Sequence, residues 1–141
     1  MNTNTLSPIA RIFAPLLLLA ALLGTSSAVE PPKGSREFKV GVTTPATNYK
    51  IEIKGIYKVG AEIWVVSKVG TAGDIGGAAI TKVSDAVKVK NADLPAGEFK
   101  IRQKVTGKSW NWDEKGDGVE HVEAKKLEEQ LKGAKKIPFT R

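Results

Sequence analysis

The sequence predicts a mainly β fold: a small antiparallel β-sandwich or barrel of about seven strands, with one C-terminal helix. Apolar and polar residues alternate through most of the chain after residue 37, which is the period of half-buried strands. Glycine, proline and asparagine residues interrupt this alternation about every 8 to 12 residues, as they do in sandwiches and barrels. Only the stretch from Val119 to Leu131 changes to a helical period.

The residues before the strands have the features of a cleavable secretory signal peptide, residues 1–28. Arg11 supplies the positive charge, residues 12–23 are almost wholly apolar, and residues 26–28 are small enough for a cleavage site. The apolar run would reach about 18 Å as a helix, whereas a bilayer core is about 30 Å thick. We therefore expect an exported protein, periplasmic or secreted, with no stable membrane span after cleavage. The alternative is an uncleaved N-terminal anchor.

Cleavage would leave about 113 residues, the size of one domain. Residues 29–36 hold two prolines, a glycine and a serine, so we expect a flexible segment there and a single β-rich domain over residues 37–141. The chain has no cysteine, which excludes disulfides, thiolate metal ligands and a cysteine nucleophile. Its net charge of +7 favours anionic partners, although lysines spread along a chain also simply keep a small domain soluble.

The first half of this domain predicts three strands. Alternation over residues 38–42 and 49–53 indicates two of them, and the first stops at a threonine–proline pair. The alternation changes phase at Gly55, which predicts a bulge or a bend. Residues 59–62 predict a hairpin turn, and the four large apolar residues 63–66 predict a central strand covered on both faces.

The second half predicts further strands. Residues 78–90 alternate with an interruption at Ser84 and Asp85, which indicates two strands separated by a break. After a turn at residues 94–97, residues 99–105 predict a strand whose outer face is wholly basic.

The tail predicts the helix. Val119, Val122, Leu127 and Leu131 form one apolar stripe, Asp117 would cap its start, and Gly133 would end it. Residues 137–139 are expected to form a short edge segment.

The densest group of glycines lies in residues 70–77, which we expect to form a long loop. It lacks the lysine and the following helix of a phosphate-binding loop, so a phosphate site is excluded by context. Loops of this kind carry recognition because a rigid scaffold presents them, although a plain connection is the simpler alternative. The candidate partner-binding residues are Gly73, Asp74, Ile75, Gly76 and Gly77.

A second candidate surface combines basic and aromatic residues. Exposed tryptophans would provide a platform for sugar rings, and lysines beside them would attract an anionic polymer. Buried tryptophans would instead anchor the core. Nucleic acid is not expected as the physiological partner, because an exported protein meets little of it. The residues of this face are Lys100, Arg102, Lys104, Trp110 and Trp112.

No catalytic, metal or cofactor site is predicted. Residues 113–118 superficially resemble a calcium loop, but Lys115 stands where an oxygen ligand belongs and Ala124 where the bidentate glutamate belongs. His121 is the single histidine and lies between glutamates, a pattern typical of a solvated surface. A hydrolase that uses His121 as its base is the enzymatic alternative.

The segments YKIEI (49–53), WVV (64–66), AIT (79–81) and VKVK (87–90) together resemble one family. They are similar to the small C-terminal domains of bacterial protease-complex-subunit proteins. The resemblance covers residues 46–90 and departs at residues 82–83, where that family has a Tyr-Pro pair. It implies a secreted, noncatalytic β-domain that binds another protein, such as a protease. We therefore expect a noncatalytic exported β-domain that binds a protein partner through its loops, with a binder of anionic or carbohydrate envelope polymers as the alternative.

Overall fold

A computed structural model of the chain describes residue 30, residues 32–108 and residues 118–141. The fold is mainly β, as the sequence predicts, with seven strands in two sheets and one helix near the C-terminus. The described residues form a sandwich-like arrangement and no closed barrel. The elements in order are β1 (Ser35–Thr44), β2 (Tyr49–Val59), β3 (Glu62–Thr71), β4 (Thr81–Lys90), the 3₁₀ turn η1 (Asn91–Asp93), β5 (Lys100–Gly107), β6 (Val119–His121), α1 (Ala124–Gln130) and β7 (Lys135–Ile137).

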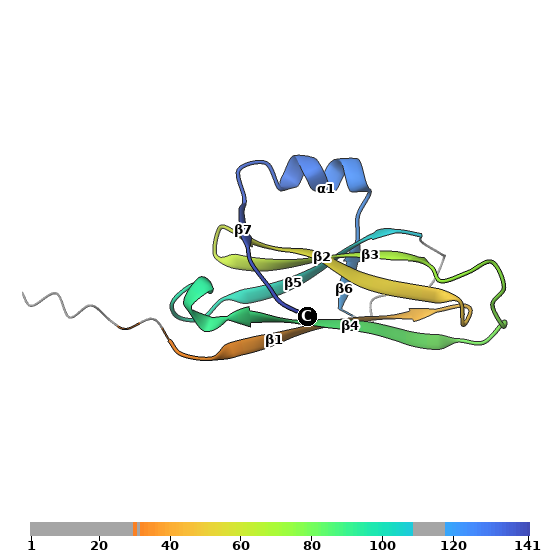
Figure 1. Cartoon of the computed structure of the whole chain (residues 1–141). Helices are drawn as coiled ribbons and strands as arrows, with labels where there is room; N and C mark the ends of the chain where they lie inside the picture. Colours follow the sequence, from red (N-terminus) through yellow and green to blue (C-terminus); the bar gives the residue numbers. More distant parts are fainter. Residues whose placement is uncertain (1–29, 31, 109–117) are drawn as a thin grey trace, which may run out of the picture.

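The two sheets differ in width. Strands β6-β5-β3-β2-β7 form the larger sheet, and β1 pairs with β4 in the smaller one. Figure 1 shows the smaller sheet on one side of the larger sheet and α1 on the opposite side. Most neighbouring strands are antiparallel, but β5 runs parallel to both β3 and β6. Strand β3 is central and its predicted two-sided cover is confirmed, because Ile63, Val65 and Val66 are all buried.

The core lies between the two sheets. Strand alternation sends one side chain of every two into this space, so β-branched residues, which fit a pleated surface, dominate it. The core cluster consists of Phe38, Val40, Val42, Ile51, Ile53, Ile56, Ile63, Val65, Val69, Val87, Val89, Val105 and Ile137.

The structure confirms the predicted irregularity in β2. The register against β3 shifts between Ile53 and Gly55, which is a bulge at the change of phase. The hairpin turn that follows β2 also lies where it is predicted, between Val59 and Glu62.

The predicted interruption of the strand at Ser84 and Asp85 is wrong. Strand β4 runs unbroken from Thr81 to Lys90. Aspartate has a low intrinsic preference for strands, but Asp85 forms polar contacts that connect the two sheets. Its Oδ2 accepts a hydrogen bond of 2.8 Å from the Ile53 backbone N–H, and Arg141 Nη1 lies 3.1 Å from the same oxygen.

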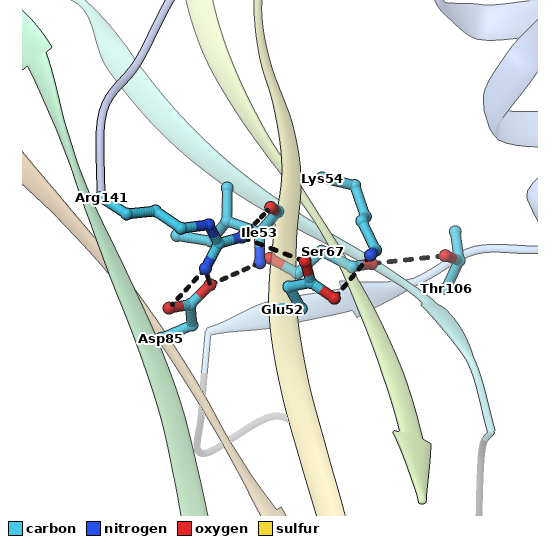
Figure 2. Close-up of polar contacts among 7 residues, drawn as sticks. All are labelled: Glu52, Ile53, Lys54, Ser67, Asp85, Thr106 and Arg141. Atoms are coloured by element: carbon cyan, nitrogen blue, oxygen red, sulfur yellow. Dashed lines mark hydrogen bonds and ion pairs between the residues drawn. The ribbon is translucent and has the colours of Figure 1, made fainter.

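We call this group, Glu52, Ile53, Asp85 and Arg141, the inter-sheet clasp (Figure 2). Arg141 Nη2 donates to the Ile53 carbonyl at 3.0 Å and to Glu52 Oε1 at 3.2 Å. Both backbone groups of Ile53 are thus paired with side chains. Asp85 and Arg141 therefore satisfy the backbone hydrogen bonds of β2 at this position, as a neighbouring strand does elsewhere.

The helix begins later than predicted. Residues Val119–His121 form β6, which pairs in parallel with β5, and α1 starts at Ala124 after its N-cap residue Glu123. Asp117, the predicted cap, lies outside the described residues. Gly133 follows the helix with φ 78°, which agrees with its predicted role as a helix stop.

The last residues connect the two sheets. Strand β7 pairs with β2 at the edge of the large sheet, two residues earlier than the predicted edge segment 137–139, which it overlaps only at Ile137. Thr140 then exchanges two backbone hydrogen bonds with Lys88 of β4, at 2.8 and 2.9 Å. Figure 1 shows this segment descending from β7 towards β4.

The predicted signal peptide lies outside the described residues. Within the described part of the chain, no helix is long and apolar enough to cross a membrane.

Candidate functional site

The loop between β3 and β4, residues 72–80, is the most exposed connection that the structure describes. Every residue in it is exposed, and the five predicted partner-binding residues all lie on it. Two of its isoleucines stand in solvent, Ile75 with 96% and Ile80 with 70% of its surface exposed. Large apolar side chains that are not buried in the fold remain available for burial against a partner.

This loop is held at its base by the neighbouring β1–β2 connection. The Ala72 N–H donates to the Asn48 carbonyl at 2.6 Å, and the Thr47 N–H donates to the Gly77 carbonyl at 3.1 Å. In return the Gly77 N–H donates to Thr47 Oγ1 at 2.8 Å. Asn48 Nδ2 adds a bond of 3.2 Å to the Gly73 carbonyl. The two connections therefore form one unit at this end of the sandwich, which we call the loop pair.

Gly76 allows the loop pair to close. A Cβ atom built on Gly76 would lie 2.6 Å from Asn48 Cβ and closer still to the Asn48 amide. Any side chain at residue 76 would push the two connections apart. The glycines of this segment thus fix the approach of the loop and leave Ile75 at its exposed tip.

The second predicted surface is wrong at Lys104. The Lys104 side chain is only 5% exposed, forms an ion pair with Glu120 of β6, and places its Nζ 4.4 Å from the centre of the Trp64 ring. A lysine ammonium can be buried when its interactions with a carboxylate and with the face of an aromatic ring offset the free energy lost on its desolvation. Lys104 therefore adds no exposed charge to the outer face of β5.

Arg102 is exposed but already has a partner. Its Nε lies 2.8 Å from both carboxylate oxygens of Glu62 on β3, and Trp64 Nε1 donates to Glu62 Oε2 at 3.0 Å. Of the three predicted cations, only Lys100 has no ion pair with the described residues. Trp110 and Trp112 lie outside those residues, so the predicted aromatic platform stays a prediction.

The Glu62 contacts predict a pH dependence. The hydrogen bond from Trp64, then that from Arg102, lowers the pKa of Glu62 below its ordinary value of 4.5. A carboxylate with a lowered folded-state pKa stabilises the fold above its unfolded pKa, and this contribution is lost as the pH falls through the folded-state value. The melting-temperature difference between the wild type and Glu62→Gln should therefore shrink as the pH is lowered from about 7 to about 3. A difference independent of pH would contradict this assignment.

His121 lies on β6, beside a hollow of about 190 Å³ lined by Val105, Gly107, Val122 and Glu123. Among the described residues, no serine or threonine lines this hollow. The described residues contain no group of three or more histidines, aspartates or glutamates that could hold a metal ion. Of the calcium-like segment, residues 113–118, only Gly118 is among the described residues.

Sequence reasoning missed the lysines of the smaller sheet. Its outer face gathers four of them from two strands that are some 40 residues apart in the chain. The alternating lysines in VKVK already indicate one basic face, but only the register of β1 against β4 adds Lys39 to it.

Comparison of the chain with protein-family models, curated proteins and solved structures finds no match. The resemblance of residues 46–90 to a protease-complex-subunit domain therefore stays a prediction. The residues described above carry the functional inference alone.

Proposed function

We propose that this chain is a noncatalytic, exported β-sandwich domain that binds a protein partner through the loop pair. The observation that carries the proposal is Ile75, which is 96% exposed at the tip of a loop held at its base by hydrogen bonds. Gly73, Asp74, Gly76 and Gly77 form the backbone that presents it.

Physical chemistry favours a protein as the partner. Complete burial of an isoleucine side chain stabilises an association by about 1.5–3 kcal/mol, which is roughly a 10- to 150-fold change in affinity. A partner needs an apolar pocket to obtain this energy, and protein surfaces provide such pockets. Because the base of the loop is already fixed, binding has to order few additional residues.

The other parts of the proposal rest on the sequence. Export is supported by the signal-like residues 1–28, and a noncatalytic role by the lack of a catalytic constellation in the sequence. The resemblance of residues 46–90 implies a protein partner as well, and a protease in particular. That range includes both members of the loop pair, residues 45–48 in large part and residues 72–80 in full.

The proposal predicts that Ile75→Asp abolishes partner binding while the fold remains intact. Partners would be captured from envelope extracts on immobilised wild-type protein and identified by mass spectrometry. The dissociation constant of an identified partner would then be measured directly. Ile75→Ala should weaken binding by roughly 10- to 150-fold, and Ile75→Leu should restore most of the affinity.

The matched control is Ala61→Asp. Ala61 is exposed in the β2–β3 turn and receives the same charge change as Ile75→Asp, away from the loop pair. Equal binding by the wild type and by Ile75→Asp would overturn the proposal. So would an equal loss of binding in Ala61→Asp and in Ile75→Asp.

A further inference from the structure

The outer face of the smaller sheet carries an excess of positive charge. Lys39 of β1 and Lys82, Lys88 and Lys90 of β4 are all exposed. In the antiparallel register, Lys39 lies opposite Ala86 and Lys82 opposite Thr43, so all four lysines share the face that points away from the core. We call these four residues the lysine face.

Few acidic side chains of the described residues lie near the lysine face. Glu37, opposite Lys88, is the single acidic residue of the two strands on this side, and Asp93 lies beyond their end. None of the four lysines has a carboxylate of the described residues within ion-pair distance. This separates the lysine face from β5, where Arg102 and Lys104 are both paired.

The lysines are arranged along a line. Residues two apart on a strand are about 6.6 Å apart, so Lys82 and Lys90 mark the ends of a track about 26 Å long, and Lys39 lies between them. Apart from Glu37, which lies opposite Lys88, the side chains between the charges are small. They are those of Ser35, Gly41, Thr43, Ser84 and Ala86.

A hollow of about 500 Å³ interrupts the track near its middle. Lys39, Lys82 and Ser84 line it, together with Gln103, whose Nε2 donates to the Lys39 carbonyl at 3.4 Å. Gly41 also lines it. A Cβ on Gly41 would contact Lys82 Cε at 3.5 Å and Ser84 Cβ at 3.6 Å and so would narrow the hollow.

We propose that the lysine face binds a linear polyanion, with the hollow at Gly41 holding one of its anionic groups. The 26 Å track fits an extended polymer better than a single small anion. Lysine binds phosphate or carboxylate as a point charge, and none of the outward side chains of β1 and β4 is an aromatic ring or an arginine that could stack on bases. Phe139 lies beside Lys88 and Lys90, but it is partly buried against the core. Charge alone therefore governs recognition. The choice of partner rests on the proposed export of the protein. In the envelope, the partner is a linear polymer that carries phosphate or carboxylate groups.

The test measures binding of long-chain inorganic polyphosphate and of poly-L-glutamate at several salt concentrations. The double variant Lys39→Gln/Lys88→Gln should bind both polymers about tenfold more weakly at low salt, and because it removes two charges its salt dependence should be shallower by about two charge equivalents. Ser84→Glu places a carboxylate in the hollow and should weaken binding comparably, whereas Ser84→Gln should not. Thermal melting checks that each variant folds.

The matched control is Lys125→Gln/Lys126→Gln. It removes the same charge from exposed residues of α1, on the opposite side of the large sheet (Figure 1). Equal weakening in both double variants would overturn the proposal, because net charge alone would then explain the binding. Binding to vesicles of anionic lipid without binding to either polymer would also overturn it and would make a membrane surface the partner. Lys39→Gln/Lys88→Gln should keep any binding that depends on Ile75, so failure of one proposal is distinguishable from failure of the other.

Discussion

Replacement of Gly107 by alanine is expected to lower the free energy of unfolding by about 3 kcal/mol. Gly107 ends β5 with φ 98°, a conformation that costs an alanine energy. A Cβ there would also lie 3.2 Å from the backbone N and C of Val69 and closer still to the Val69 carbonyl oxygen. These atoms belong to the β3–β5 pairing, and the same carbonyl accepts a 3.2 Å hydrogen bond from the Lys108 N–H. Urea denaturation followed by circular dichroism would measure the change.

Gly70→Ala is the matched control for this variant. Gly70 lies next to Val69 on β3, and no atom lies within 4 Å of a Cβ built on it. Its φ lies outside the positive range, so we expect a change within about 0.5 kcal/mol. Equal stability of the two variants would show that the backbones of β3 and β5 move apart at little energetic cost, and it would contradict the prediction.

The second large effect is expected at the inter-sheet clasp. Asp85→Ala leaves the N–H of the buried Ile53 without its acceptor, and an unsatisfied buried donor costs about 1–3 kcal/mol. The loss of the Arg141 contact adds little, because the Arg141 side chain is 50% exposed. Thermal or urea unfolding would give the total, which we expect near 2 kcal/mol.

Two companion variants separate the roles of the clasp. Asp85→Asn keeps an oxygen that can accept from the Ile53 N–H and should retain about half or more of the lost stability. Arg141→Ala removes the contacts of the arginine alone and should cost less than about 1 kcal/mol. If Arg141→Ala destabilises the protein more than Asp85→Ala, the arginine rather than the Ile53 N–H determines the stability of the clasp.

Local patterns in the sequence predict the strands that are defined by their own alternation. The bulge at Gly55, the turn after Val59 and the burial of β3 all follow from residues that are neighbours in the chain. Such features need no knowledge of distant partners, because the period of the apolar residues specifies the face that is buried.

The errors arise where a distant partner overrides local preference. Val119 fits a helical stripe, yet it pairs with Gln103 of β5 in a parallel strand. Asp85 predicts a break in β4, yet the clasp gives it a partner 32 residues away. Lys104 predicts an exposed cation, yet Glu120 and Trp64 allow its burial. In each case the free energy of a tertiary contact outweighs the local preference, and a pattern of neighbouring residues does not reveal that contact.

The candidate sites divide in the same way. The exposed loop with Ile75 follows from the glycines of residues 73–77, since connections between strands run over the surface. Its predicted bounds of 70–77 are wrong, because Gly70 and Thr71 belong to β3 and the loop runs from residue 72 to residue 80. The lysine face could not be predicted as one surface, because it depends on the register of β1 against β4.

The pairing of β7 with β2 also affects how a nascent chain folds. Ile56 pairs with Ile137, so this edge of the large sheet stays uncovered until a segment about 80 residues further along the chain has reached it. Until then β2 presents unpaired N–H and carbonyl groups to any other extended chain. The slowest contacts to form are thus those that protect the molecule from aggregation, and a factor that shields β2 during this interval would raise the yield of folded protein.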